Sequence, residues 1–379
     1  MPRWDIFCRV VDNYGDIAVT WRLARQLVAE HGINVRLWID DLCPLAALCR
    51  QADPYATIQI LNGVEIRLWE QDFPNVDIAD VVIEAFACDI PESYVSTLAA
   101  KTIKSRWLNL EYMSAEDWVA GCHQLPSPHP RLPLVKHFFF PGFTANTGGL
   151  IREHDLIYRR DAFQNTAKSQ AEFWTKLGIA SAAHTFKISL FGYENPALPT
   201  LLTAWANNPT PISVLLPESL MSPQVNDFFG IDSHWQRGNL TVHKLPFLDQ
   251  DNYDQLLWAC DLNFVRGEDS FVRALWAGKP LVWHIYPQAD NAHHAKLNAF
   301  LALYQQGLNN HDAAQLTAFW HAWNQINSDV LDWTSWFAVY SQIHQHHAAW
   351  VTELAAQSDL AANLVVAFTA RSSQPSPKH

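Results

Sequence analysis

The stretch RGEDS at residues 266–270 decides the fold of this chain. It follows the apolar run from Leu262 to Val265 and precedes the helix-like stretch from Phe271 to Ala277. A strand that ends in a turn of glycine and acidic residues, and then opens a helix, presents backbone N–H groups where a phosphate can bind. Gly278 and Pro280 can end this helix, and the apolar segment 281–286 is expected to be the next strand. The stretch therefore predicts a βαβ unit that binds a nucleotide.

The size and composition of the chain predict a two-domain globular protein. Its 379 residues are enough for two domains that each bury a core. Hydrophobic residues make up 49% and charged residues 17% of the chain, which excludes a disordered protein and predicts large aromatic cores. The formal net charge of -12 argues against general nucleic-acid binding, which needs a basic surface. A basic protein partner or a buried positive pocket is more compatible with it.

Neither a disulfide framework nor a metal site is expected. The six cysteines lack metal-ligand spacing. They are Cys8, Cys43, Cys49, Cys88, Cys122 and Cys260. Among the 17 histidines, His344 and His347 have i, i+3 spacing and His293 adjoins His294, but no carboxylate or cysteine completes a site, so a solvated helix face is favoured. With neither a signal-peptide pattern nor an apolar stretch of membrane-spanning length, the cytoplasm is the expected location.

Apolar runs alternate with helical or loop segments in both halves of the chain, as an α/β protein requires. In the first half these runs are 4–11, 35–39, 64–69, 81–86 and 107–110, and in the second half 186–191, 212–215, 240–245, 262–265 and 281–285. We expect an N-terminal Rossmann-like acceptor-side domain at 1–150, a linker at 151–183, a C-terminal nucleotide-sugar-binding domain at 184–354 and a tail at 372–379. A helix at about 355–371 is expected to complete the first domain. Two opposed Rossmann-like domains with a cleft between them are the plan of the GT-B glycosyltransferases.

Four motifs resemble one family over nearly the whole chain. They are DNYGD at 12–16 with WRLARQL at 21–27, EYMSAEDW at 111–118, FFFPGFTANTGGLIRE at 138–153, and RGEDSFVRALWAGKPLVWHIYPQ at 266–288. The chain resembles the EarP family of protein-arginine rhamnosyltransferases. The resemblance implies a GT-B fold and inverting transfer of L-rhamnose from dTDP-β-L-rhamnose to an arginine guanidinium of elongation factor P, which promotes translation of polyproline stretches. It implies no cofactor beyond this substrate.

The turn after the first strand holds the candidate catalytic carboxylates of the first half. Arginine is a poor nucleophile because its pKa exceeds about 12, so a carboxylate must orient the guanidinium and accept its proton. Asp12 and Asp16 bracket this turn, and Asp16 matches the general base proposed for the family. Asn13, Tyr14 and Gly15 are candidates for donor contacts. Without the resemblance, an ordinary turn with Asp16 as helix N-cap would be the preferred interpretation.

The 266–270 turn holds the remaining candidates for chemistry. Glu268 matches a residue that the family needs for activity. Asp269 and Ser270 are expected to offer backbone N–H groups to the donor diphosphate, with helix capping as the alternative. Arg266 is expected to neutralise the departing diphosphate without a metal ion. Arg273, one helical turn further, fits a surface salt bridge equally well.

Aromatic side chains near the predicted strand ends of the second half are candidates for stacking on the thymine and the deoxysugar. These candidates are Phe191, Tyr193, Phe247, Tyr253 and Tyr286. Phe247 is the preferred base-stacking residue, because it follows a strand in a loop at the predicted cleft. Gln288 is a candidate polar contact to the donor. Each aromatic residue, taken alone, is more typical of a core.

Three residues after a strand of the first half are acceptor-side candidates. Glu111, Tyr112 and Ser114 are placed to contact the sugar or the incoming protein loop. A capping interaction between Ser114 and Asp117 explains the same pattern equally well.

Three other functions remain as alternatives. A GT-B transferase could use another nucleotide sugar or acceptor, although a lipid or polysaccharide acceptor would call for a basic or amphipathic membrane-facing stretch, and none is evident. A non-catalytic nucleotide-binding scaffold is compatible with the periodicity, but the paired carboxylates favour chemistry. A dinucleotide oxidoreductase is disfavoured because the first turn, DNYGD, lacks the G-x-G-x-x-G fingerprint.

Overall fold

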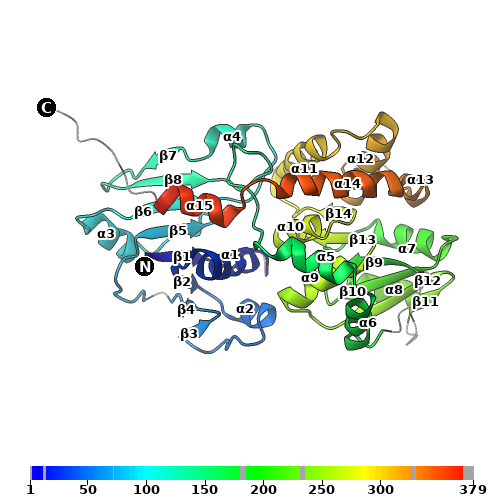
Figure 1. The fold of residues 1–379 in the computed structure, drawn as a ribbon, viewed down its shortest axis with the longest axis horizontal. Coiled ribbons are helices and arrows are strands. Elements are labelled where there is room, and N and C mark those ends of the chain that lie inside the picture. The colour runs from blue at the N-terminus through cyan, green and yellow to red at the C-terminus, as the bar shows by residue number, and fades with distance from the viewer. Residues whose placement is uncertain are drawn as a thin grey trace. The chain divides into compact units, whose positions relative to one another are not determined.

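The computed structural model describes residues 2–11, 14–70, 72–179, 185–230, 235–326 and 330–369. Contacts divide the chain into two compact units (Figure 1). Unit 1 is formed by residues up to 46, by residues 51–153, and by the chain from Gln357 onward. Unit 2 is formed by residues 47–50 and 154–356.

Unit 1 contains an eight-stranded sheet in the order β3-β4-β2-β1-β5-β6-β8-β7. Its elements are β1 (Arg3–Cys8), α1 (Gly15–His31), β2 (Asn34–Ile39), β3 (Ile58–Leu61), β4 (Val64–Leu68), β5 (Val81–Ala85), α3 (Glu92–Ala100), β6 (Arg106–Leu110), α4 (Trp118–Cys122), β7 (Pro126–Pro128), β8 (Val135–Phe139) and α15 (Leu360–Thr369), with α2 (Cys43–Leu48) at the unit boundary. Neighbouring strands are parallel along the series β4-β2-β1-β5-β6-β8, whereas β3 and β7 pair antiparallel at the two edges. Strand β5 is buried along its whole length, as a parallel strand covered on both faces should be.

Two features explain how α1 and α15 join this sheet. Helix α1 ends at Gly32, whose φ of 61° is the left-handed conformation that glycine adopts readily. Helix α15 packs on α1, and its first backbone N–H, at Leu360, donates to the carbonyl of Leu150. The neighbouring Gly149 has a φ of 74°, and a Cβ there would lie 2.5 Å from the carbonyl oxygen of Ser358. Only glycine therefore fits where the two crossing segments of the chain meet.

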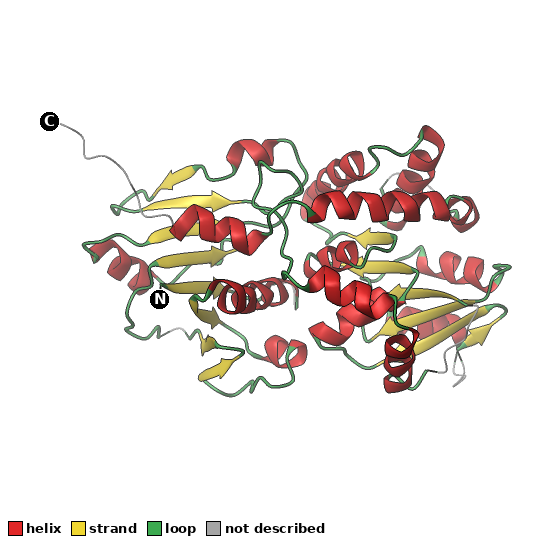
Figure 2. Cartoon of the chain, viewed as in Figure 1, coloured by secondary structure: helices red, strands yellow, loops and turns green. Residues whose placement is uncertain are grey.

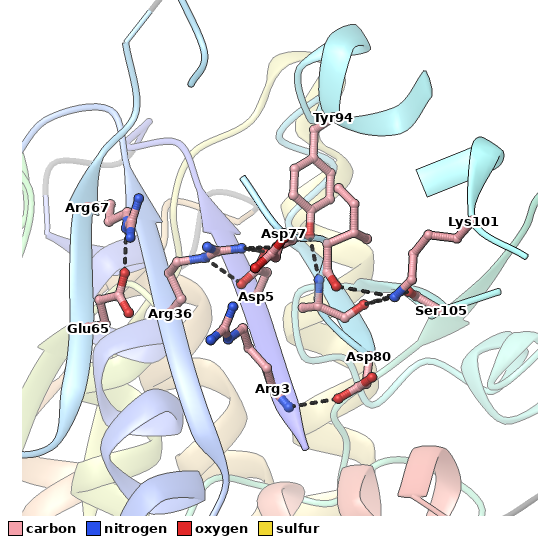
Figure 3. A network of polar contacts seen from close by, with 12 residues as sticks. Arg3, Asp5, Arg36, Glu65, Arg67, Asp77, Asp80, Tyr94, Lys101 and Ser105 are labelled. Atoms are coloured by element: carbon pink, nitrogen blue, oxygen red, sulfur yellow. Dashed lines mark hydrogen bonds and ion pairs between the residues drawn. The ribbon is translucent and has the colours of Figure 1, made fainter. Parts of the chain in front are cut away.

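A buried polar network holds β1, β2 and α3 together (Figure 3). Asp5 of β1 and Arg36 of β2 are register partners, and the guanidinium forms two hydrogen bonds of 2.8 and 2.6 Å to the carboxylate. Tyr94 of α3 donates its hydroxyl hydrogen to the same carboxylate at 2.5 Å. The bidentate pairing gives a fixed geometry inside an apolar core. This network fixes the register of β1, the strand that leads into the turn before α1.

Unit 2 contains a six-stranded sheet in the order β11-β12-β10-β9-β13-β14, with helices around it (Figure 2). Its elements are α5 (Leu156–Gln164), α6 (Ala167–Lys176), β9 (Phe186–Leu190), α7 (Leu198–Ala206), β10 (Ile212–Pro217), α8 (Ser222–Phe229), β11 (Gln236–Arg237), β12 (Leu240–Leu245), α9 (Gln250–Ala259), β13 (Leu262–Arg266), α10 (Asp269–Trp276), β14 (Leu281–His284), η1 (Ala289–Asn291), α11 (Ala292–Tyr304), α12 (Asn310–Trp323), α13 (Trp333–Ala338) and α14 (Tyr340–Ala355). The strands β12, β10, β9, β13 and β14 are parallel to one another, and the edge strand β11 pairs antiparallel with β12.

The predicted linker at 151–183 is wrong for the described residues 154–179. Helices α5 and α6 belong to unit 2, because they pack on each other and α5 packs on α9. Phe163 of α5 lies with its ring centroid 5.8 Å from that of Phe173 in α6 and 5.9 Å from that of Trp258 in α9. The polar residues between these aromatic side chains made the segment resemble a connection.

Both sheets have a topological switch point, where the chain leaves neighbouring strands in opposite directions. In unit 1 it lies between β1 and β5, and in unit 2 between β9 and β13. Ligands of open α/β sheets bind outside the carboxyl ends of the strands at such points. A ligand site is therefore expected at the turns after β1, β5, β9 and β13.

The expectation of a solvated histidine face is wrong for His347 of α14, which is fully buried. Its Nδ1 lies 2.8 Å from the Tyr304 hydroxyl and its Nε2 lies 3.3 Å from the carbonyl oxygen of Leu275. A carbonyl only accepts, so Nε2 carries the hydrogen and Nδ1 accepts from the tyrosine. Burial lowers the pKa of His347 to about 3. The side chain is therefore neutral at ordinary pH.

We expect His347 to make unit 2 sensitive to mild acid. Its pKa is about 6.5 in the unfolded chain and lower in the fold, so its contribution is complete above pH 6.5 and is lost as the pH falls toward the folded value. Between pH 7 and pH 5 this loss is about 2 kcal/mol. In urea titrations at both pH values, His347→Phe should lower stability at pH 7 yet reduce the acid-induced loss by about that amount. The exposed His311→Gln should leave it unchanged; an equal acid-induced loss in His347→Phe would contradict the assignment.

Candidate active site

Asp16 lies in the first turn of α1, just past the carboxyl end of β1, and its side chain is buried. The N-cap residue of α1 is Tyr14, so the interpretation of Asp16 as the N-cap is wrong. One carboxylate oxygen accepts a hydrogen bond of 3.0 Å from the backbone N–H of Val11, and the other accepts 2.9 Å from the hydroxyl of Tyr112. The carboxylate is thus held in one orientation at the switch point of unit 1.

Tyr112 lies against the ring of Phe86, with ring centroids 4.4 Å apart and planes 11° from parallel. Phe86 follows β5 and has a φ of 57°, which is unusual for a bulky residue. Tyr112 follows β6, so its hydroxyl links the ends of two strands to Asp16. About 38% of Tyr112 remains exposed. The stack therefore forms an accessible wall beside the carboxylate.

Glu111, adjacent to Tyr112, is a second carboxylate at this edge. Burial raises the pKa of Glu111, while a hydrogen bond from the Asn109 amide and the charge of Lys136 oppose the increase. Lys136 also forms an ion pair of 3.0 Å with the buried Glu84 of β5. The carboxyl ends of β5 and β6 therefore carry more acidic than basic groups, which suits a cationic ligand.

The remaining candidates of unit 1 are less informative. The Ser114 hydroxyl donates to the carboxylate of Glu116 at 2.9 Å and accepts from its backbone N–H at 3.0 Å, so the proposed capping pair of Ser114 with Asp117 is not formed. Tyr14 and Gly15 lie at the start of α1. Asp12 and Asn13 lie outside the described residues.

The 266–270 turn has the predicted geometry. Strand β13 ends at Arg266, Gly267 turns the chain with a φ of 65°, and α10 begins at Asp269 with Glu268 as its N-cap residue. No side-chain hydrogen bond caps the helix at Glu268. The N–H groups of a first helical turn have no acceptor within the helix, and they combine with the helix dipole to attract anions. The start of α10 therefore has a geometry that can bind an anion at the switch point of unit 2.

Arg266 is held between two aromatic rings. Its guanidinium carbon lies 4.8 Å from the ring centroid of Phe191 and 4.7 Å from that of Tyr193, both in the turn after β9. The residue is 8% exposed. Planar guanidinium groups are attracted to aromatic faces, so the two rings hold the cation in place. A fixed positive charge thus lies beside the start of α10.

Arg273 is not a surface residue as the salt-bridge alternative supposed. It is buried, and its guanidinium forms two hydrogen bonds, of 3.0 and 2.6 Å, to the carboxylate of Asp254 in α9. This pair joins α9 to α10 inside the core. Its role is structural support for the helix whose first turn faces the strand ends.

Glu268 forms an ion pair with Lys296 of α11. The preceding Gly267 is fixed by a hydrogen bond of 2.8 Å from the indole N–H of Trp283 to its carbonyl oxygen. Trp283 in turn stacks on Phe271, with ring centroids 4.1 Å apart. The turn is thus supported from β14 and α11 as well as from β9.

The aromatic candidates of unit 2 all follow or flank the carboxyl ends of strands. Tyr253 packs edge-on against Phe191 at 5.7 Å, and Tyr286 packs edge-on against Tyr193 at 5.6 Å. Phe247 lies half-buried two residues past β12, which is separated from β9 by β10. Gln288 is exposed beyond β14, and its backbone N–H donates to Nδ1 of His293 at 3.0 Å. Phe191, Tyr193, Tyr253 and Tyr286 therefore form one cluster around Arg266, whereas Phe247 lies further along the edge.

His284, at the end of β14, was not a candidate from the sequence. Its Nδ1 accepts a hydrogen bond of 3.3 Å from the backbone N–H of Tyr193, so it fixes the turn after β9. Burial and the charge of Arg266 lower the pKa of His284 to about 3. The imidazole is therefore neutral and adds no charge to the site. No sequence pattern indicated that His284 supports the turn after β9.

Among the residues that the structure describes, no group of three or more histidine, cysteine, aspartate or glutamate side chains is arranged to hold a metal ion. No helix in the described ranges is long and apolar enough to cross a membrane.

The two switch points offer complementary chemistry. Unit 1 presents an oriented carboxylate beside an aromatic wall, which can bind a cation and accept a proton. Unit 2 presents a helix start and a caged guanidinium, which can bind a diphosphate. Each unit thus carries one of the two binding capacities that transfer of a diphosphate-activated group to a cationic nucleophile requires.

Comparisons with known proteins converge on one family. Residues 4–370 match the family model described as elongation factor P rhamnosyltransferase EarP. A protein-arginine rhamnosyltransferase of Pseudomonas putida is 50% identical over 367 residues, covering 96% of this chain and 97% of the relative. The corresponding protein of Shewanella oneidensis is 42% identical, with 96% of each chain covered. A solved structure concerned with EarP-mediated arginine glycosylation of translation elongation factor EF-P is 37% identical, with a TM-score of 0.67, 97% of this chain and 99% of that chain covered. The predicted GT-B class, with two Rossmann-like units, is confirmed.

Proposed function

Since this chain belongs to the EarP family and is a protein-arginine rhamnosyltransferase, we propose that its donor is dTDP-β-L-rhamnose and its acceptor an arginine of elongation factor P. The observation that carries the proposal is the pairing of Arg266, caged between Phe191 and Tyr193, with the start of α10. This combination suits the diphosphate of a nucleotide sugar. The name of the matching family supports the choice of acceptor.

The reaction proposed is a single displacement with inversion. A guanidinium nitrogen attacks the anomeric carbon of rhamnose, and the bond from that carbon to the diphosphate oxygen breaks with its electron pair remaining on dTDP. The nitrogen loses a proton to Asp16, whose orientation is set by Val11 and Tyr112. Asp12 is proposed to assist in holding the guanidinium. Because the displacement occurs in one step, the β-linked donor gives an α-linked product.

The departing diphosphate is proposed to be stabilised by protein charges rather than by a metal ion. Arg266 and the first turn of α10 provide fixed positive electrostatic potential at the strand ends. Preorganised groups of this kind need no reorganisation as charge develops. Glu268 is proposed to contribute to catalysis from the same turn, while Asp269 and Ser270 contribute backbone N–H groups. No cofactor besides the sugar nucleotide is proposed.

The thymine and deoxysugar are proposed to lie against the aromatic residues at the strand ends of unit 2. Tyr253, Tyr286 and Phe247 provide the stacking surfaces, and Gln288 a polar contact. Tyr14 and Gly15, with Asn13, are proposed as further donor contacts from the turn before α1. On the acceptor side, Tyr112 and Glu111 are proposed to contact the arginine, and Ser114 the loop that carries it.

Mass spectrometry of the acceptor tests this function. Purified elongation factor P is incubated with the protein and either dTDP-β-L-rhamnose or UDP-glucose, with and without a chelator. We expect a gain of one deoxyhexose on one arginine, with the rhamnose donor only and in both chelator conditions. An acceptor with that arginine changed to lysine should remain unmodified. Binding of dTDP without transfer to any acceptor would instead favour a nucleotide-binding scaffold, and transfer from UDP-glucose would overturn the donor.

The proposed product is a modified translation factor, which places the reaction in the cytoplasm. Rhamnosylation would activate elongation factor P for rescue of ribosomes that stall at polyproline stretches. A reporter containing consecutive prolines should be translated poorly in cells without the transferase and recover when the active protein is supplied.

A further inference from the structure

Lys296 is a charged residue of α11 that lies at the proposed donor site without having been indicated by any sequence motif. Its ammonium group forms an ion pair with Glu268, the N-cap residue of α10. It also lies 5.9 Å from the ring centroid of Trp283, whose indole fixes Gly267. The side chains of Lys296 and Glu268 are 19% and 18% exposed, so the pair is largely shielded but reachable from solvent.

Lys296 and Arg266 approach the start of α10 from opposite sides. Strand β13, which leads into α10, lies between β9 and β14. Arg266 contacts rings in the turn after β9, whereas Lys296 contacts Trp283 of β14. The first turn of α10 is therefore flanked by two cations, Arg266 on the side of β9 and Lys296 on the side of β14. A diphosphate has two phosphate groups, and such an arrangement offers one cation for each.

We propose that Lys296 is a donor-site residue that exchanges its ion pair with Glu268 for the diphosphate of the sugar nucleotide. This inference rests on the proposed function. A carboxylate beside the helix start repels a diphosphate, so the pairing with Lys296 removes an electrostatic penalty before the donor binds. When the donor is present, the diphosphate competes for the ammonium group, and Glu268 is released to act in the reaction.

The departure of dTDP gives Lys296 a larger effect on the reaction than on donor binding. Breaking the bond between sugar and phosphate leaves an electron pair on the terminal phosphate, which gains one negative charge. A cation beside that oxygen stabilises the product-like transition state more than the bound donor, and such differential stabilisation raises kcat. Lys296→Gln should therefore lower kcat more than it raises KM for the donor.

A double-mutant cycle separates direct contact with the diphosphate from an effect through Glu268. Binding of dTDP is measured by calorimetry for the native chain, Lys296→Gln, Glu268→Gln and the double variant. We expect Lys296→Gln to weaken dTDP binding by roughly tenfold in the native background and by at least as much in the Glu268→Gln background, because a charge-assisted hydrogen bond is lost in each and no ion pair has to be exchanged in the second. If the loss disappears in the Glu268→Gln background, Lys296 acts only through Glu268, and the proposal is overturned. Equal affinity of the native chain and Lys296→Gln would also overturn it.

Two further variants guard against misinterpretation. Lys296→Arg keeps the charge and should bind dTDP nearly as well as the native chain, and failure to do so while folded would count against the proposal. Lys168→Gln removes a lysine whose side chain is 84% exposed on α6 and should leave dTDP binding unchanged. If the native chain itself does not bind dTDP, the proposed function fails instead. The two failures are therefore distinguishable.

Discussion

Replacement of Asp16 by asparagine is expected to lower kcat for rhamnosyl transfer by about 10²- to 10⁴-fold, the range typical of a lost general base. An asparagine side chain has nearly the same shape, and its oxygen can still accept one of the two hydrogen bonds that the carboxylate receives from Val11 and Tyr112. It cannot take a proton from the attacking guanidinium. The affinity for dTDP should be retained, because the proposed diphosphate site is formed by unit 2. Steady-state kinetics and calorimetry measure the two quantities separately.

Asp40 provides a matched control for this experiment. It is another aspartate of unit 1, at the end of β2, and its carboxylate accepts a hydrogen bond of 2.8 Å from the backbone N–H of Val10. Asp40→Asn should therefore reproduce any general effect of neutralising a carboxylate near this turn. We expect its kcat to stay within about threefold of the native value, as for a surface change outside the chemistry. Equal losses in Asp16→Asn and Asp40→Asn would remove the assignment of Asp16 as the base.

Tyr112 connects the proposed base to a second strand end, and this connection was not predictable from the sequence. The two residues are 96 positions apart, and only the parallel order β1-β5-β6 brings their strand ends to one edge. What the sequence did indicate is that both follow apolar runs. Since the carboxyl ends of parallel strands share an edge, residues after such runs tend to meet, but the identity of the partners depends on strand order.

The apolar runs predicted most of the central strands and fewer of the edges. The runs at 81–86 and 262–265 correspond to β5 and β13, which are buried on both faces and therefore continuously apolar. The edge strands β3 and β7 were missed because they are short and partly exposed, and β7 is bounded by Pro126 and Pro128. An edge strand does not need apolar residues on both of its faces, so its sequence indicates a strand less clearly.

The backbone conformation of single residues could not be predicted from the sequence either. Phe86 supports the ring of Tyr112 with a positive φ, which a phenylalanine adopts rarely and no sequence pattern indicates. Likewise, His284 and Lys296 could not be predicted as site residues, because their roles depend on contacts with turns that follow other strands. The sequence thus located the turns that carry chemistry, whereas the supporting side chains required tertiary structure.

Replacement of Arg266 by glutamine is expected to lower kcat/KM for the donor by about 10²- to 10³-fold, comparable to the loss of one preorganised donor to a developing oxyanion. The guanidinium is caged by Phe191 and Tyr193 and lies beside the start of α10, so it meets the diphosphate without rearrangement. Arg266→Lys should recover only part of this loss, because an ammonium group cannot stack as a plane between two rings or bind phosphate through a fixed fork. Donor saturation curves for the three proteins give the comparison.

Arg237 is the matched control for Arg266, because it also stacks on an aromatic ring. Its guanidinium carbon lies 4.1 Å from the ring centroid of Phe228, but it is exposed on the edge strand β11, away from the switch point between β9 and β13. If a stacked arginine mattered only for the stability of unit 2, Arg237→Gln and Arg266→Gln would have similar effects on the melting temperature and neither would change dTDP affinity selectively. The diphosphate assignment requires a different result, in which only Arg266→Gln weakens dTDP more than it weakens thymidine. Thymidine lacks both phosphates, so the difference between the two ligands reports the charge of Arg266 rather than the integrity of the aromatic cage.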